Sequence, residues 1–210
     1  MVTILATGRE NERFIFDATR SDFFNQEGLV QGACDSPLTE LGQEQARQAG
    51  AYLQGRGIRF GRLFSSTQER ASDTLELVSG RTDYTRLKGI KEWNFGLFEA
   101  QPERLQPKFR SGATSFENLF VPYGGEGVEQ VGERVLVTLT EVMEQADAEP
   151  VLAVSHGGAM WAFYLKIAAQ ALDPKLRFGN CAVCHYHYEQ GHFKLAEVID
   201  PLTGDVYECE

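Results

Sequence analysis

Short apolar runs alternate along this chain with longer segments of helical periodicity, and this alternation limits the fold more than any other feature. Val2–Ala6, Arg62–Ser65 and Val151–Ser155 have the length and composition of buried strands. After the second of these runs, apolar residues recur at helical spacing at Ala71, Leu75 and Val78. This order of elements predicts an α/β fold: a mostly parallel central sheet covered by helices on both faces.

The remaining elements follow from the same patterns. Helices are expected over Thr39–Gln54, with Thr39 as N-cap, over Val128–Ala146 and over Met160–Leu172. Cys181–Tyr188 and Phe193–Val198 predict a hairpin. Residues 99–127, rich in Pro, Gly and aromatic residues, predict a long excursion over one end of the sheet. We expect a single domain over residues 1–210, the usual size for one domain.

Composition narrows the choice of partners. The formal net charge is −10, without a block of Lys and Arg, which argues against nucleic acid and anionic membranes. A small anionic ligand is compatible with this charge, because a local group of arginines can oppose the global field. The sequence leaves homo-oligomerisation open.

The expected compartment is the cytoplasm. We find no signal peptide, because Val2–Ala6 is too short for an apolar signal region. Met160–Leu172 comes closest to a membrane span but is interrupted by Lys166 and Gln170. The cysteines are expected to stay reduced in that compartment: Cys34, Cys181, Cys184 and Cys209.

Polar residues follow several of the predicted strands. Thr7-Gly8-Arg9-Glu10 follows the first run, Ser65-Ser66 leads to Arg70, and Ser155 is followed by His156. Glu92 follows a short extended stretch around Tyr84–Leu87. Since ligands in open α/β sheets bind beyond the carboxyl ends of the strands, these residues predict one pocket. Arg70 and two helix N-termini, after Ser66 and His156, suit a phosphomonoester, and a buried Glu92 suits a proton donor.

Four motifs in order resemble those of the histidine phosphatase superfamily, in its phosphoglycerate mutase-like branch. They are Asp35-Ser-Pro-Leu-Thr39, Phe64-Ser-Ser-Thr-Gln-Glu-Arg-Ala71, Glu92-Trp-Asn-Phe-Gly-Leu-Phe-Glu99 and Val154-Ser-His-Gly-Gly158. The resemblance implies a three-layer α/β/α sandwich. It implies Glu92 and His156 as catalytic residues, no metal or organic cofactor, and phosphate binding by Arg70, His156, Gly157, Asn25 and Arg9.

The departure from the family pattern concerns the nucleophile. In the family an N-terminal histidine becomes a phosphohistidine, and the chain has no histidine before His156. Alignment through Glu10 puts Gly8 at that position, whereas alignment back from Asn25 puts Thr19 there. The two registers differ by an insertion within residues 9–24.

Three functions fit these observations. The first is binding of a small phosphorylated metabolite or inorganic phosphate with lost or altered catalysis. The second is phosphomonoester hydrolysis through a substitute nucleophile: Asp17, Thr19 or Asp22, His156 itself, or an activated water. The third is a non-catalytic partner-binding role.

We do not expect the remaining Cys and His motifs to form a cofactor or metal site. Cys181-Ala-Val-Cys184-His185 matches a haem-attachment pattern, but it lies in a strand pattern, where residues 181 and 184 point to opposite faces and would not share a zinc ion. We expect His185 and His187 to form a solvent-facing row.

Overall fold

The computed structural model describes residues 22–145, 150–168, 176, 178–179 and 181–209, together with the backbone of residues 2–5. Seven strands form one sheet in the order β3-β2-β4-β1-β5-β6-β7. The strands are β1 (Val2–Leu5), β2 (Leu63–Ser66), β3 (Thr85–Leu87), β4 (Leu152–Ser155), β5 (Val183–Glu189), β6 (His192–Ile199) and β7 (Val206–Glu208). The sequence patterns predicted each of them but β7.

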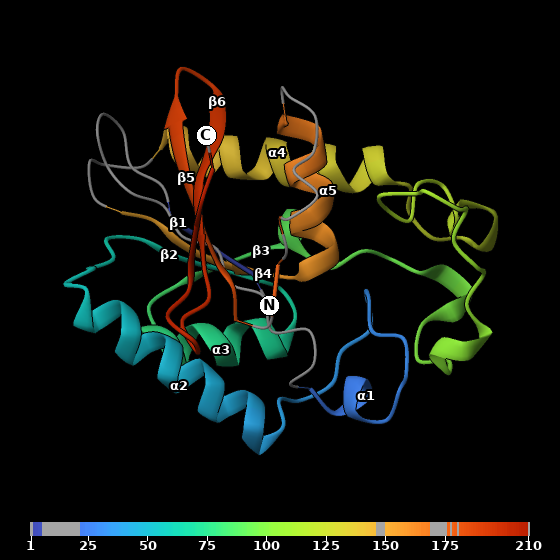
Figure 1. Ribbon diagram of the computed structural model, residues 1–210, viewed down its shortest axis with the longest axis horizontal. Helices are drawn as coiled ribbons and strands as arrows, with labels where there is room; N and C mark the ends of the chain where they lie inside the picture. Colours follow the sequence, from blue (N-terminus) through green and yellow to red (C-terminus); the bar gives the residue numbers. More distant parts are fainter. Residues whose placement is uncertain are drawn as a thin grey trace.

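Helices cover both faces of this sheet. Figure 1 shows α2 (Glu40–Gly55) and α3 (Glu69–Ser79) on one face, and α4 (Val128–Glu144) and α5 (Gly157–Ile167) on the other. Alternate residues of β4 serve the two layers: Leu152 and Val154 pack toward α2 and α3, while Ala153 packs toward α4 and α5. The predicted three-layer α/β/α sandwich is therefore confirmed.

The sheet is parallel where the site lies and mixed elsewhere. β2 pairs in parallel with both β3 and β4, so these three strands end at the same edge. The prediction of a mostly parallel sheet holds for this part. Beyond it, β5 is antiparallel to β6, because the hairpin turn at Gln190 and Gly191 reverses the chain, and β6 is antiparallel to β7.

β1 runs against the expected direction. It is antiparallel to β4 and pairs Val2 with Ser155, so its carboxyl end lies at the edge opposite His156. The strands whose carboxyl ends lie together at the site are therefore β2, β3 and β4. The residues after β1, including Gly8, Arg9 and Thr19, lie outside the described part of the chain.

The helices begin where local chemistry dictates. Thr39 is the N-cap of α2, as predicted, and its hydroxyl accepts the Gly42 N–H at 3.1 Å. α5 begins earlier than predicted, directly after His156, and ends at Ile167. Lys166, the one charged residue of this helix, is exposed and pairs with Glu129 at 2.9 Å. No helix among the described residues is long and apolar enough to cross a membrane.

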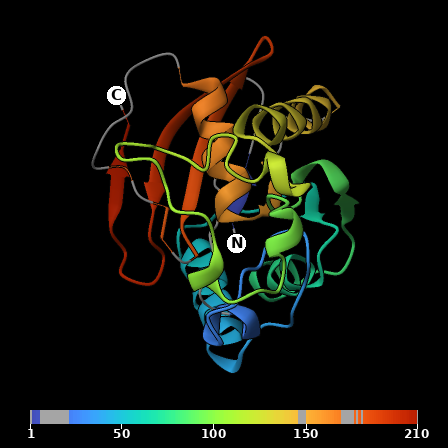
Figure 2. The ribbon, with the colours of Figure 1, turned by 90° about the vertical axis from the view of Figure 1, so that its right-hand side faces the viewer.

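The segment 99–127 forms the predicted excursion over the site end of the sheet. It contains short 3-10 turns, including Glu103–Leu105 and Val121–Tyr123. Figure 2 shows it beside α1 (Phe23–Gln26) at the same end of the molecule. Backbone bonds join the two: Glu103 N–H donates to Gly28 at 2.9 Å, and Val30 N–H donates to Gln101 at 2.8 Å.

One histidine of the predicted solvent-facing row is buried. His185 is 4% exposed, and its Nδ1 lies 3.0 Å from a carboxylate oxygen of Glu197 on β6. His187 is exposed as expected. The prediction was wrong for His185 because the cross-strand carboxylate provides a partner inside the sheet.

Candidate active site

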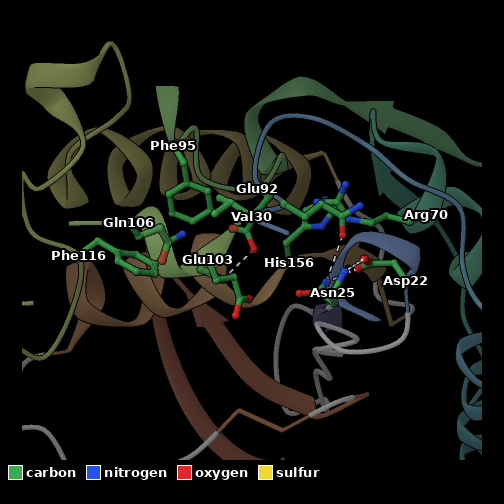
Figure 3. A pocket seen from close by; sticks show the side chains of 12 residues that line it. Asp22, Asn25, Val30, Arg70, Glu92, Phe95, Glu103, Gln106, Phe116 and His156 are labelled. Atoms are coloured by element: carbon green, nitrogen blue, oxygen red, sulfur yellow. Dashed lines mark hydrogen bonds between the residues drawn. The ribbon is translucent and has the colours of Figure 1, made fainter. Parts of the chain in front are cut away.

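A pocket of about 220 Å³ lies where β2, β3 and β4 end. Four of the predicted site residues, which come from four separate parts of the chain, line it together: Asn25, Arg70, Glu92 and His156. Figure 3 shows Glu92 and His156 near its middle, with Arg70, Asn25 and Asp22 on one side. The convergence expected from the strand ends is therefore present for these residues.

His156 is placed by the end of β4 and the start of α5. It has an extended backbone (φ −139°, ψ 157°) at the N-cap of α5, which turns its ring away from the helix and into the pocket. Its Nε2 lies 2.6 Å from the hydroxyl of Ser66 at the end of β2. The ring is 2% exposed. Burial, reinforced by the charge of Arg70, holds the pKa of His156 well below its usual range, so the free imidazole is neutral at pH 7.

Glu92 is buried against the first turn of α5. Its carboxylate accepts the N–H groups of Trp93 at 2.7 Å, Gly158 at 3.0 Å and Ala159 at 2.7 Å. Burial raises the pKa of Glu92, while the bonds from Trp93 and Gly158 and the charge of Arg70 oppose the rise. A raised pKa in an anion pocket is the property that a proton donor to a leaving oxygen requires.

Arg70 lies in the first turn of α3 and is 4% exposed. Its Nη1 donates to the Cys34 carbonyl at 2.9 Å and to Asp35 at 2.8 Å, and its Nη2 donates to the Gly32 carbonyl at 3.1 Å. These bonds use three of the five guanidinium N–H groups. The other two, on Nε and Nη2, have no acceptor among the described residues, and such a pair can hold two phosphoryl oxygens.

The helix N-termini contribute less to the pocket than the sequence suggested. At α3 the Glu69 N–H is bound by Asp35, and at α5 Glu92 binds the amides of Gly158 and Ala159. The prediction that both termini face an anion was therefore wrong for these groups, because protein carboxylates already cap them. Gly157 N–H has no acceptor among the described residues, so it remains a candidate hydrogen-bond donor to a bound phosphate.

Asn25 belongs to a polar cluster around Asp22, which is 1% exposed and also lines the pocket. Asp22 is the N-cap of α1 and accepts the backbone N–H of Asn25 at 2.9 Å and its side-chain amide at 2.5 Å. In the amide orientation that satisfies its neighbours, Gln31 also donates to Asp22 and accepts from Ser36. The amide nitrogen of Asn25 thus faces Asp22.

Sequence reasoning missed the side chain that ties these parts together. Gln68 is 3% exposed and donates to the carbonyls of Gly32 at 2.7 Å and Cys34 at 3.0 Å. Its amide oxygen accepts the Glu92 N–H at 2.8 Å. Gln68 therefore links the Arg70-binding loop to the acid. It lies inside one of the recognised motifs, two residues before Arg70, but its partners come from distant segments that no local pattern identifies.

Two further polar networks, which the sequence also did not predict, hold the loops around the pocket in place. The Glu99 carboxylate accepts the N–H groups of Ala33 and Cys34, both at 2.9 Å. Arg134 on α4 pairs with Glu126 at 2.8 Å and donates to the Glu92 carbonyl at 3.0 Å. No group of three or more His, Cys, Asp or Glu residues suitable for a metal ion occurs in the described ranges.

The chain is thus an α/β/α sandwich in which a histidine, an arginine and a buried carboxylic acid meet at one strand edge. The family model of the histidine phosphatase superfamily (branch 1) matches residues 19–201. The chain belongs to this superfamily and is phosphoglycerate mutase-like.

Similar proteins agree with this assignment. The probable phosphoglycerate mutases GpmB of Salmonella newport and Salmonella agona are each 28% identical over 193 residues, covering 87% of this chain and 88% of theirs.

Three solved structures share the fold. A phosphoglycerate mutase from Bacillus anthracis has a TM-score of 0.70 at 23% identity, covering 92% of this chain and 91% of its own. A phosphoserine phosphatase mutant from Entamoeba histolytica, in complex with phosphoserine, has a TM-score of 0.70 at 21% identity, covering 94% and 96%. A mycobacterial glucosyl-3-phosphoglycerate phosphatase, in complex with VO3, has a TM-score of 0.70 at 20% identity, covering 100% of both chains.

Proposed function

We propose that this protein binds a small phosphomonoester or inorganic phosphate in the pocket, and that its catalysis is lost or altered. The observation that carries the proposal is that Arg70, Glu92 and His156 meet in one pocket of a chain with no histidine before His156. Arg70 would bind two phosphoryl oxygens, with His156, Gly157 N–H and Asn25 around the anion. Arg9 and Gly8 lie outside the described residues and stay candidates.

Related proteins support phosphate binding. The neighbours include a phosphatase in complex with VO3 and a histidine-to-alanine mutant of a phosphoserine phosphatase in complex with phosphoserine. The second case shows that a site of this fold holds a phosphomonoester when a histidine has been replaced. Losing a nucleophile removes orders of magnitude in rate while binding interactions survive.

The family match favours one register for the missing nucleophile. It begins at Thr19 and includes Asn25, whereas Gly8 lies before it. This supports the alignment that puts Thr19 at the histidine position and Ala18 at the position of the preceding arginine. Residue 19 thus replaces residue 8 as the preferred place to rebuild the nucleophile.

The test is to restore the arginine and the nucleophilic histidine of the family. We compare hydrolysis of an aryl phosphate by the native protein, Gly8→His and Ala18→Arg/Thr19→His, with each variant repeated in a His156→Ala background. We expect a silent native protein and a gain of at least about 100-fold in Ala18→Arg/Thr19→His, with an acid-labile phosphohistidine detected by mass spectrometry. Vanadate titration measures phosphate binding independently, and its absence in the native protein would contradict the proposal.

Asp22 favours a second candidate function, an active phosphomonoester hydrolase. Its carboxylate lines the pocket on the side of Arg70 (Figure 3). Attack by an Asp22 oxygen would form an acyl phosphate and break the ester P–O bond, with Glu92 protonating the departing alcohol oxygen. Water would then cleave the acyl phosphate, releasing phosphate and returning the proton to Glu92. Native turnover that is abolished in Asp22→Asn, with a phosphoaspartate trapped by hydroxylamine, would establish this function.

A non-catalytic partner-binding role is the third candidate. Exposed apolar side chains favour it, notably Leu97, just before the excursion, at 77% exposure and Val121, on the excursion, at 44%. A stable partner that binds equally well to native protein and to Arg70→Ala, combined with no vanadate binding, would select it.

A further inference from the structure

The pocket has two chemically different ends. Figure 3 shows Phe95, Phe116, Gln106 and Glu103 together on one side of Glu92, and Arg70, Asn25 and Asp22 on the other. Arg70 is the single Lys or Arg among the described residues of the lining. Among the described lining residues, one end therefore has a cation that can bind an anion, and the other end has none.

Glu92 lies between these ends, which fixes how an ester would be oriented. A proton donor must reach the oxygen that bridges phosphorus and the alcohol. With the phosphoryl group on Arg70, that oxygen lies toward Glu92, and the alcohol part extends toward Phe95 and Phe116. The second end is therefore the leaving-group end.

The wall of the leaving-group end is aromatic and firmly supported. The rings of Phe95 and Phe116 meet edge to face with centroids 5.2 Å apart, and Phe120 packs against both at 4.8 and 5.4 Å. Phe116 also contacts the buried Trp93 ring at 5.2 Å. Because neighbouring rings hold the wall on several sides, it is a preformed apolar surface.

Exposed apolar side chains continue this surface at the rim of the pocket. Phe109 is 54% exposed and stacks on Phe116 with centroids 5.1 Å apart. Leu105 is 49% exposed and lies between two lining residues in the chain, Glu103 and Gln106. Such exposed apolar area beside a pocket is typical of a ligand-binding surface.

The charge at this end comes from Glu103. It lies on the 3-10 turn Glu103–Leu105, and none of the ion pairs among the described residues includes it. A carboxylate or second phosphate on the ligand would meet a like charge here, and the described lining residues include no Lys or Arg besides Arg70 to balance it. A neutral or positively charged alcohol part meets no such penalty.

We infer that the ligand is a phosphomonoester of an apolar, aromatic-type alcohol that has no carboxylate or second phosphate. This inference rests on the proposed phosphate site and adds the class of substrate. It excludes, as preferred ligands, phosphoglycerate-like acids that carry a carboxylate beside the phosphate, although the chain resembles phosphoglycerate mutases. Phe116 provides the apolar selection and Glu103 the charge selection.

The test uses four non-hydrolysable phosphonates, so that it does not depend on turnover: methylphosphonate, benzylphosphonate, 4-carboxybenzylphosphonate and 4-(aminomethyl)benzylphosphonate. Affinities are measured by calorimetry at low salt, with inorganic phosphate as reference. We expect benzylphosphonate to bind at least about tenfold more tightly than methylphosphonate, as for an apolar group entering an apolar pocket. The carboxylate should weaken binding by roughly tenfold, and the aminomethyl group should not.

Variants assign each preference to its residue. Phe116→Leu should lose most of the benzyl preference with unchanged inorganic phosphate affinity. Glu103→Lys should reverse the order of the carboxy and aminomethyl ligands, whereas Glu141→Lys, the same change on an exposed position of α4, should not.

Absence of the phosphate site and a different substrate class give different binding results. If no phosphonate and no inorganic phosphate binds, the proposed function and this inference are both overturned. If phosphate binds but methylphosphonate equals benzylphosphonate, or 4-carboxybenzylphosphonate binds most tightly, the inference alone is wrong.

Discussion

The carboxylate of Glu92 lies 3.0 Å from the amide nitrogen of Gly158, so the candidate proton donor also caps the helix that follows His156. The same carboxylate accepts the next amide, Ala159, at 2.7 Å. The position of His156 and the position of the Glu92 carboxylate are therefore coupled through the start of α5. A side chain built onto Gly158 would lie 2.8 Å from a Glu92 oxygen, which is why glycine is needed there.

Gly158→Ala should therefore destabilise the native protein by roughly 1–2 kcal/mol, because the added methyl group displaces the cap. In a Glu92→Ala background the same change should stabilise by up to about 1 kcal/mol, because alanine is the better helix former. Urea unfolding of the four proteins in the cycle measures the coupling. Gly55→Ala, a helical glycine with open space around it, should change stability equally in both backgrounds.

The raised pKa of Glu92 should make stability depend on pH in a defined direction. The native state holds the proton more tightly than the unfolded chain, so stability should fall as pH rises from about 4.5 through the native pKa of Glu92. Each pH unit of that interval corresponds to about 1.4 kcal/mol. Urea unfolding of native protein and Glu92→Gln between pH 4 and 8 isolates the contribution, which should vanish in the variant. Equal slopes in both proteins would show that Glu92 has the same pKa in the native and unfolded states.

The elements of this fold could be predicted because each carries its own local signal. Apolar periodicity located α3 and α4, and the Thr39 cap located α2. The direction of β1 could not be predicted, since a four-residue apolar run has no feature that distinguishes parallel from antiparallel pairing. β7 was missed because Val206–Glu208 is short and mostly exposed, and has no alternating apolar face.

The site was partly predictable for the same reason. Arg70, Glu92 and His156 lie in recognisable motifs, whereas the roles of Gln68 and Asp35 depend on three-dimensional contacts. Asp35 binds Arg70 at 2.8 Å and also the start of α3, which occupies donors that the sequence assigned to a ligand. A motif identifies which residue types are present and leaves open which of their bonds the protein itself satisfies.

Arg70→Ala should weaken vanadate binding by roughly 1.5–3 kcal/mol, the usual effect of losing charge-assisted bonds. Isothermal titration compares it with Arg59→Ala, which removes an exposed arginine remote from the pocket lining and should leave affinity unchanged. His156→Ala should cost a similar amount. If vanadate binds all three variants with native affinity, the anion site lies elsewhere.

Gln68→Ala should lower the free energy of unfolding by about 2–4 kcal/mol, since a buried amide with three backbone partners is removed. It should also weaken vanadate binding, because the carbonyls of Gly32 and Cys34 that orient Arg70 lose a partner. Gln48→Ala, which removes an exposed bond to Glu44 on α2, should change stability by less than about 0.5 kcal/mol. Native affinity in a destabilised Gln68→Ala would limit its role to stability.

His156 should gain a proton when an oxyanion binds. Burial and Arg70 hold its pKa well below 6.5 in the free protein, and an anion beside the ring favours the imidazolium. Sulfate is a suitable probe, because it does not titrate between pH 5 and 8. NMR titration of the histidine ring protons should show the His156 pKa rising with sulfate. In Arg70→Ala the free pKa should already be higher, and sulfate should raise it less. A His156 signal that ignores sulfate while vanadate still binds would place the imidazole outside the anion's coordination and leave Arg70 as the residue that holds it.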